Sequence, residues 1–270
     1  MSDRLAGKRA VVVGAGQTPG ETIGNGKATA LLFAREGAEV LCVDRVLARA
    51  EETAAEIVDD GGAATALAAD ITDAEQAASI TAAALDRMAG IDVLVNNVGI
   101  GLAGPSSDGP AHLCDEDAFD RTLDVNLKAM WFTIKAAIPA MRDAGGGSIV
   151  NISSLASLGG SNQLAYEISK AGVNRLTLHV ANGNAKYGVR CNAILPGLMD
   201  TPMAIEGIAK ATGRSVEETR AQRDQRVPLR GRMGTGWDTG NAALFLASDE
   251  SQFVTGVLLP VDGGMSARIG

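Results

Sequence analysis

The sequence predicts an α/β fold in one domain, a doubly wound, Rossmann-like parallel sheet with helices on both faces. Three observations favour it. Short apolar runs alternate with longer segments of helical periodicity, the pattern of successive βαβ units. The short runs are apolar throughout, as expected for strands covered on both faces. The first run ends in a glycine-rich turn that leads into a helical segment.

The elements follow in order from their apolar patterns. The expected strands are 9–13, 40–43, 63–69, 93–95, 147–152 and 190–194. The expected helices are 27–36, 46–58, 74–88, 119–140 and 166–187. Thr72 or Asp73 is the expected N-cap of the third helix, because both side chains can accept hydrogen bonds from free backbone N–H groups. Residues 199–237 are polar and helical with little apolar periodicity, so we expect a substrate lid that extends from a single domain, 1–270.

Composition excludes several functions. The 270 residues are 46% hydrophobic and 21% charged, enough to bury a large core. The net charge of −8 disfavours binding to nucleic acid phosphates. No apolar run approaches the roughly 18 residues of a membrane span, and the first residues do not resemble a secretion signal. Three isolated cysteines and two distant histidines disfavour disulfides and a metal site. We therefore expect a cytoplasmic protein without a membrane or nucleic acid partner.

The first turn is the candidate phosphate-binding segment. Gly14, Gly16 and Gly24 lie between the first strand and the first helix, with Asn25 following. Glycines there allow a pyrophosphate to approach the backbone at a helix N-terminus. Asp44 ends the second strand, where a carboxylate accepts from an adenosine ribose hydroxyl and repels a 2′-phosphate, which favours NAD over NADP. Arg45 beside it leaves NADP open, because a guanidinium binds phosphate well.

Tyr166 and Lys170 form the candidate catalytic pair. They stand four residues apart on an expected helix and therefore share a face. An ammonium near a phenol lowers the phenol pKa, which would make Tyr166 a proton donor and acceptor near neutral pH. Such a pair is common by chance, and Ser153 and Ser154 at the end of a strand supply the support.

At this point the chain resembles the short-chain dehydrogenase/reductase family. The resemblance rests on motifs in family order over nearly the whole chain. They are the first turn, Asp70-Ile71, Asn97-Val98-Gly99, Asn126, Ser153-Ser154, Tyr166 with Lys170, Pro196-Gly197-Leu198 with Thr201, and Val261 to Gly264.

The resemblance implies a role for each matched position. Tyr166 would be the general acid/base, with Lys170 lowering its pKa and holding the nicotinamide ribose. Ser154 would bind the substrate oxygen, and Asn126 would hold a water in a proton relay. The adenosine half of the cofactor would be lined by Asp70, Ile71, Asn97, Val98 and Gly99. The nicotinamide end would be bound by Pro196, Gly197, Leu198 and Thr201.

Two departures from the family pattern lead to further expectations. Gly24 follows Gly14 at a spacing of ten positions where the family has a spacing of four, so about six residues, 17–22, enlarge the first turn. We expect this insertion to fold over the adenosine or pyrophosphate, with Thr18 or Thr22 as hydroxyl donors. The segment between the serines and Tyr166 is one residue shorter than usual. Counting back from Tyr166 selects Ser153, whereas the strand motif selects Ser154, which we favour because deletions settle in loops.

The resulting hypothesis is an NAD-dependent short-chain alcohol dehydrogenase or ketone reductase acting on a small, largely apolar secondary alcohol or ketone. The family resemblance also implies a homotetramer. One alternative is a non-catalytic NAD-binding sensor or scaffold, although binding alone needs neither Ser154 nor Asn126. Others are an epimerase or dehydratase, for which the chain lacks a C-terminal substrate domain, and an enoyl reductase, whose usual catalytic spacing is longer than Tyr-x-x-x-Lys.

Overall fold

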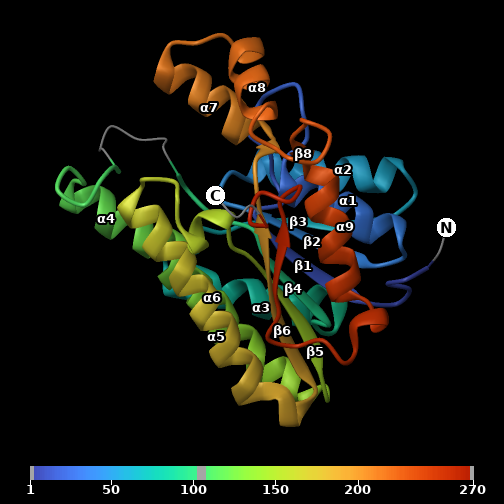
Figure 1. Ribbon diagram of the computed structural model, residues 1–270. Coiled ribbons are helices and arrows are strands. Elements are labelled where there is room, and N and C mark those ends of the chain that lie inside the picture. Colours follow the sequence, from blue (N-terminus) through green and yellow to red (C-terminus); the bar gives the residue numbers. More distant parts are fainter. Residues whose placement is uncertain (1–2, 102–107, 268–270) are drawn as a thin grey trace.

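The computed structural model describes residues 3–101 and 108–267. Seven parallel strands form the main sheet, in the order β3-β2-β1-β4-β5-β6-β9. Their bounds are β1 Arg9–Val13, β2 Glu39–Asp44, β3 Ala63–Ala68, β4 Val93–Asn96, β5 Gly147–Ile152, β6 Val189–Pro196 and β9 Leu258–Val261. The order reverses between β1 and β4, which confirms the predicted doubly wound sheet (Figure 1).

Helices cover both faces of the sheet. One face packs against α1 (Asn25–Arg35), α2 (Leu47–Asp59) and α9 (Gly236–Ala247); the other packs against α3 (Ala74–Met88), α5 (Ala129–Asp143) and α6 (Leu164–Asn184). Within β1, Val11 and Val13 face the α3/α5/α6 side, while Ala10 and Val12 face the other. Because every strand residue meets a helix layer, the strands read as continuous apolar runs.

The prediction of one regular helix over 119–140 is wrong. The chain there forms three consecutive segments: α4 (Glu116–Leu123), a π-helical turn (Asp124–Lys128) and α5. A π turn inserts a residue without breaking the helical hydrogen-bonding direction, so the apolar period does not reveal it. The predicted cap of α3 is confirmed for Asp73, whose carboxylate accepts from the backbone N–H groups of Glu75 and Gln76.

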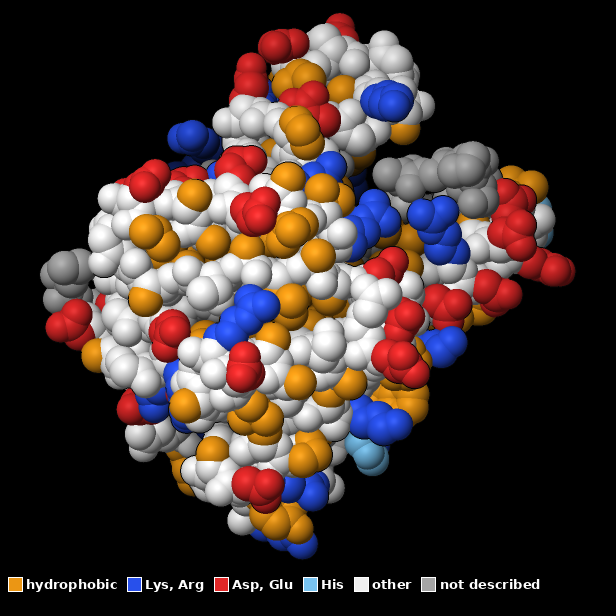
Figure 2. Space-filling view, turned by 180° about the vertical axis from the view of Figure 1, so that it is seen from behind, with side chains coloured by type: hydrophobic (Ala, Val, Ile, Leu, Met, Phe, Trp, Pro, Cys, Tyr) orange, Lys and Arg blue, Asp and Glu red, His pale blue; other side chains and the backbone are white. Residues whose placement is uncertain are grey.

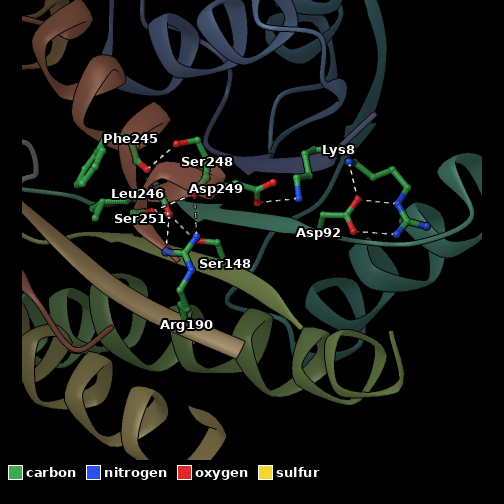
Figure 3. A network of polar contacts seen from close by, with 10 residues as sticks. Lys8, Asp92, Ser148, Arg190, Phe245, Leu246, Ser248, Asp249 and Ser251 are labelled. Atoms are coloured by element: carbon green, nitrogen blue, oxygen red, sulfur yellow. Dashed lines mark hydrogen bonds and ion pairs between the residues drawn. The ribbon is translucent and has the colours of Figure 1, made fainter. Parts of the chain in front are cut away.

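Helix α9 and strand β9 were not predicted. Pro260 makes β9 look unlike a strand, but β9 lies at the edge of the sheet, where proline is tolerated. Arg190 of β6 ties this region together by donating to the carbonyl oxygens of Leu246 at 2.8 Å and Ser248 at 3.3 Å (Figure 3). Ser148 of β5 donates to the same Leu246 oxygen at 2.8 Å. These bonds hold the carboxyl end of α9 against the sheet.

The segment expected as a lid leaves the sheet directly after β6. It contains β7 (Met199–Asp200), α7 (Pro202–Thr212), α8 (Val216–Asp224) and β8 (Gly234–Thr235). Figure 1 shows α7 and α8 projecting beyond the end of the sheet. Ile205, Val227 and Met233 form a small apolar cluster of their own. Trp237, placed at the lid boundary, instead packs with the core of the α1/α2/α9 face.

The surface is of mixed charge. In Figure 2, acidic and basic side chains are interspersed over the face shown. Within the described ranges, no helix has the length and apolarity needed to cross a bilayer.

Candidate active site

The predicted site residues meet at one edge of the sheet. Parallel strands bring their carboxyl ends to the same side, so the residues that follow β1, β2, β4, β5 and β6 come together there. They are Gly14 after β1, Asp44 at the end of β2, Asn97 after β4, Ser153 and Ser154 after β5, and Pro196 at the end of β6.

Helix α6 presents Tyr166 and Lys170 to the end of β5. The Lys170 Nζ lies 5.8 Å from the centroid of the Tyr166 ring and donates to the carbonyl oxygen of Ile152 at 3.0 Å. The Ser154 side chain lies close enough to the Tyr166 phenol to act on its pKa, which it lowers. A phenol, a hydroxyl and an ammonium therefore lie within one small cluster.

The two adjacent serines point to different environments. Ser153 is 3% exposed, and its hydroxyl donates to the carbonyl oxygen of Lys170 at 3.1 Å. Ser154 lies at the start of a short 3₁₀ turn (Leu155–Leu158), where its Oγ accepts from the Ala156 N–H at 3.1 Å and also meets Tyr166. Only the hydroxyl of Ser154 lies next to the Tyr166 phenol.

Burial shifts the pKa values of the candidate catalytic pair, Tyr166 and Lys170. Desolvation raises the pKa of Tyr166 and outweighs the hydrogen bond with Ser154, which acts in the opposite direction. Desolvation also lowers the pKa of Lys170 to about 8. This differs from the expectation that Lys170 would lower the Tyr166 pKa, because both groups are desolvated together and burial disfavours the charged form of each.

Asn126 lies in the π-helical turn and is fully buried. Its Oδ1 accepts from the Ile100 N–H at 2.7 Å, and its Nδ2 donates to the Ile100 carbonyl oxygen at 3.0 Å and to Ser169 Oγ at 3.1 Å. A Cβ on Gly99 would lie 3.1 Å from Lys170 Nζ and 3.5 Å from Asn126 Oδ1. Asn126 thus fixes the segment after β4 against α6.

The first turn has the shape of a backbone cradle. Gly14 has φ +84°, and a Cβ there would lie 3.1 Å from Val98. A Cβ on Gly16 would lie 2.6 Å from a carboxylate oxygen of Asp44. Asn97 donates from Nδ2 to the Gly14 carbonyl oxygen at 3.0 Å. A turn with glycines at 14 and 16 that leads to the N-terminus of α1 fits a dinucleotide phosphate site.

The predicted adenosine residues lie beside this turn. Asp44 Oδ1 accepts from the Val46 N–H at 3.0 Å. Hydrogen bonds from the Thr72 hydroxyl and N–H hold the pKa of Asp70 below its usual value, and the positive charge of Arg45 acts in the same direction. Ile71 is buried. Arg45 is exposed and therefore accessible to a ligand phosphate.

The nicotinamide-side residues connect the sheet to the lid. The Gly197 N–H donates to the Val261 carbonyl oxygen at 3.0 Å, and the Leu198 oxygen accepts from Gly234 at 3.2 Å. Thr201 is buried and precedes α7 as its N-cap residue. Pro196-Gly197-Leu198 thus forms the stem of the lid.

The insertion in the first turn contacts the lid. Gln17 accepts from the Gly24 N–H at 2.9 Å, which closes the loop on itself. Arg220 of α8 lies 3.6 Å from Glu21 and 3.0 Å from Asp200. A Cβ on Gly20 would lie 2.7 Å from Pro202. Figure 1 shows this N-terminal loop rising beside α8, so the inserted segment contacts the helices expected to form the lid.

Two residues of the site region escaped the sequence reasoning. Gly26 is the tightest glycine in the first turn, because a Cβ there would overlap the Gly14 carbonyl oxygen and lie 2.5 Å from Asn97 Nδ2. The spacing of the glycines that follow the insertion is the sequence feature that could have identified Gly26. Asp108 accepts hydrogen bonds from the N–H groups of Ala165 and Tyr166, both at 3.0 Å. No local motif predicts that contact.

Proteins that are similar to this chain over nearly its whole length are oxidoreductases by name. A family model described as enoyl-(acyl carrier protein) reductase matches residues 21–266. The L-rhamnose 1-dehydrogenase (NAD(P)(+)) of Azotobacter vinelandii is 37% identical over 98% of this chain and 99% of its own. The trans-4-hydroxycyclohexanecarboxylate dehydrogenase of Sinomonas cyclohexanicum is 38% identical over 99% and 96%. The structure of levodione reductase has a TM-score of 0.89 at 28% identity over 98% and 99% of the two chains.

The crystal structure of a protein from Burkholderia xenovorans that is described as a short-chain dehydrogenase/reductase aligns with a TM-score of 0.88, at 40% identity over 99% of both chains. The chain belongs to the short-chain dehydrogenase/reductase family.

Proposed function

We propose that this protein interconverts a secondary alcohol and a ketone with NAD(H) as hydride carrier, and that Tyr166 is its general acid/base. The observation that carries the proposal is the cluster in which the Ser154 side chain acts on the Tyr166 phenol while Lys170 Nζ lies 5.8 Å from the centroid of its ring. Binding a dinucleotide alone requires neither Ser154 nor Asn126, which argues against a sensor or scaffold.

Each residue of the cluster has one task. In the oxidative direction the Tyr166 phenolate takes the hydroxyl proton, and the Ser154 hydroxyl holds the substrate oxygen as it becomes a carbonyl. The nicotinamide supplies the hydride acceptor. Lys170, whose Nζ lies 5.8 Å from the centroid of the Tyr166 ring, would hold the nicotinamide ribose. A water held near Asn126 passes the proton onward to solvent, and the reverse direction uses the same groups.

The residues around the first turn favour NAD over NADP. The Asp44 carboxylate lies directly beside Gly16, where it would accept from a ribose hydroxyl and repel a 2′-phosphate. The exposed Arg45 is the feature that would allow NADP. We place the adenosine against Asp70, Ile71 and Asn97, and the insertion 17–22 over the pyrophosphate, where the lid contacts it.

The substrate class proposed is a secondary alcohol on an aliphatic or alicyclic framework. Only 3% of the residues are aromatic, which leaves few surfaces for stacking planar substrates. The names of the two curated relatives described above refer to a sugar and to a hydroxycyclohexane acid. Enoyl reduction fits less well, because Tyr166 and Lys170 are spaced as in alcohol and ketone enzymes of the family.

A cytoplasmic homotetramer completes the proposal. Trp131 of α5 and Ile168 of α6 are each 43% exposed, on the long helices expected to join subunits. A monomer mass in gel filtration would contradict this assembly without affecting the catalytic assignment.

The deciding experiment follows nicotinamide absorbance with NAD or NADP and a panel of cyclic secondary alcohols and ketones. Turnover with NAD that is lost in Tyr166→Phe is the expected result. Turnover only with NADP would overturn the cofactor assignment alone. Full activity in Tyr166→Phe would refute the mechanism, and reduction of enoyl substrates alone would favour the alternative reaction.

A further inference from the structure

Helix α6 carries the catalytic tyrosine in its first turn but lacks a local cap. A helix begins with four backbone N–H groups that have no partner within the helix. The residue before α6 is Gln163, whose side chain makes no capping hydrogen bond. Tyr166 is the third residue of the helix, in the turn that frays most readily.

A distant segment supplies the missing partners. The Asp108 carboxylate accepts from the Ala165 and Tyr166 N–H groups at 3.0 Å each, across 57 and 58 residues of sequence. The next residue, Gly109, accepts from the Leu164 N–H at 3.1 Å. The Glu167 N–H donates to the Gln163 carbonyl oxygen at 2.9 Å. The Glu167 bond is the first bond of the regular helix, and the free N–H groups of the three residues before it are all satisfied by residues 108 and 109.

Asp108 is itself held in place. Cys114 Sγ lies 3.6 Å from the same carboxylate, and the Leu113 and Cys114 N–H groups donate to the Pro110 carbonyl oxygen at 2.8 and 3.0 Å. The segment that provides the cap is therefore a compact turn, docked on the helix through charge-assisted bonds.

We propose that Asp108 is a positioning residue for the reaction assigned to Tyr166. Its carboxylate fixes the first turn of α6, and so sets the distance and direction from the phenol to Ser154. The negative charge at a helix N-terminus adds a favourable interaction with the helix dipole. The expected effect on catalysis rests on the proposed function. The expected effect on the structure of α6 rests on the hydrogen bonds alone.

The test compares Asp108→Ala and Asp108→Asn with the matched control Asp73→Ala. Asp73 caps α3 in the same way, accepting from two backbone N–H groups at 2.8 and 3.1 Å. At saturating cofactor we expect kcat to fall about 3- to 30-fold in Asp108→Ala. Asp108→Asn keeps one acceptor oxygen and should lose less. Asp73→Ala should leave kcat unchanged, and the Kd for NAD should stay within about twofold in the two Asp108 variants.

A second readout does not depend on activity. The chain has two tyrosines, so ring-labelled tyrosine gives two NMR signals, assigned with Tyr187→Phe. Asp108→Ala should shift or broaden the Tyr166 signal and speed amide exchange in residues 164–167, while Asp73→Ala should do neither.

Two results would overturn the inference. One is a kcat in Asp108→Ala within twofold of wild type alongside a melting temperature lowered as much as in Asp73→Ala, which would make the cap purely structural. The other is an unchanged Tyr166 signal and unchanged exchange. If the wild-type protein oxidises no alcohol with either nucleotide, the proposed function fails, and the NMR and exchange data still decide the role of Asp108. Should Asp108→Ala not fold, Asp108→Asn answers the same questions.

Discussion

Replacing each of the two adjacent serines by alanine should produce opposite phenotypes. In Ser154→Ala the phenol of Tyr166 loses the neighbouring hydroxyl that lowers its pKa, and the substrate oxygen loses its proposed donor. A hydrogen bond to a charged or developing-charge oxygen contributes about 1.5–3 kcal/mol. We therefore expect kcat/KM to fall about 10- to 150-fold. The fold should persist, because the remaining partner of Ser154 is the N–H of Ala156 in a partly exposed turn.

Ser153→Ala should instead affect stability. Its hydroxyl is 3% exposed and donates to the Lys170 carbonyl oxygen at 3.1 Å, so the variant loses a buried hydrogen bond of about 0.5–1.5 kcal/mol. We expect a melting temperature lower by a few degrees and kcat/KM within about threefold of wild type.

The assay is initial-rate absorbance of the reduced nicotinamide at several substrate concentrations, with melting followed by circular dichroism. The double variant Ser154→Ala with Tyr166→Phe tests coupling, since two groups that act on one oxygen lose less together than the sum of their separate losses. A Ser153→Ala variant that loses more than tenfold in kcat/KM while Ser154→Ala stays near wild type would refute the reasoning. It would return the catalytic role to the serine obtained by counting back from the tyrosine.

Three further predictions concern the pH response, the lid contact and the first turn. Burial lowers the pKa of Lys170 from 10.5 to about 8, so above pH 8 the unfolded chain binds more protons than the folded one. The free energy of unfolding of the wild type should therefore rise between pH 8 and 10 relative to that of Lys170→Met. Equal pH slopes in urea titrations of the two proteins would contradict this. Arg220→Ala should raise the Kd for NAD about 2- to 5-fold in isothermal titration, and Glu21→Ala should raise it less because the Glu21 side chain is 76% exposed. Salt at 0.5 M should remove much of the difference in Kd between wild type and variants. Unchanged affinities would refute a coupling between the Arg220–Glu21 contact and NAD binding. Gly26→Ala should lower the free energy of unfolding by about 1–3 kcal/mol in urea denaturation, because its Cβ would overlap the Gly14 carbonyl oxygen. Gly183→Ala in α6, with open space around its Cβ, should raise it by about 0.4–1 kcal/mol. An unchanged stability of Gly26→Ala would contradict that overlap.

The sheet was predictable because its signal is local. Six of its seven strands are apolar runs between glycines and helices, and a run of that kind identifies itself within a few residues. Strand β9 was missed because Pro260 resembles a break, and only its place at the sheet edge makes proline acceptable. The π turn around Asn126 was missed because one inserted residue leaves the apolar period nearly unchanged.

The candidate site shows the same division. Gly14 was predicted from the turn after a strand and Ser154 from the family's strand motif; their roles stay predictions, while the structure brings both to one edge of the sheet. The tertiary cap from Asp108 and the bridge from Arg220 to Glu21 join segments that are far apart in sequence. Contacts of that kind depend on how loops cross the finished sheet, and a single sequence carries no local pattern for them.

The position of β9 has a consequence for how the chain is made. Strand β6 is complete at Pro196, but its partner begins only at Leu258, about sixty residues later. At a synthesis rate of roughly 5–20 residues per second, the open edge of β6 waits on the order of 3–12 s for its neighbour. An unpaired strand edge is a template for pairing with another chain. Nascent chains of this protein therefore pass through a period in which aggregation competes with completion of the sheet, and holding that edge is a task for which a ribosome-bound chaperone is suited.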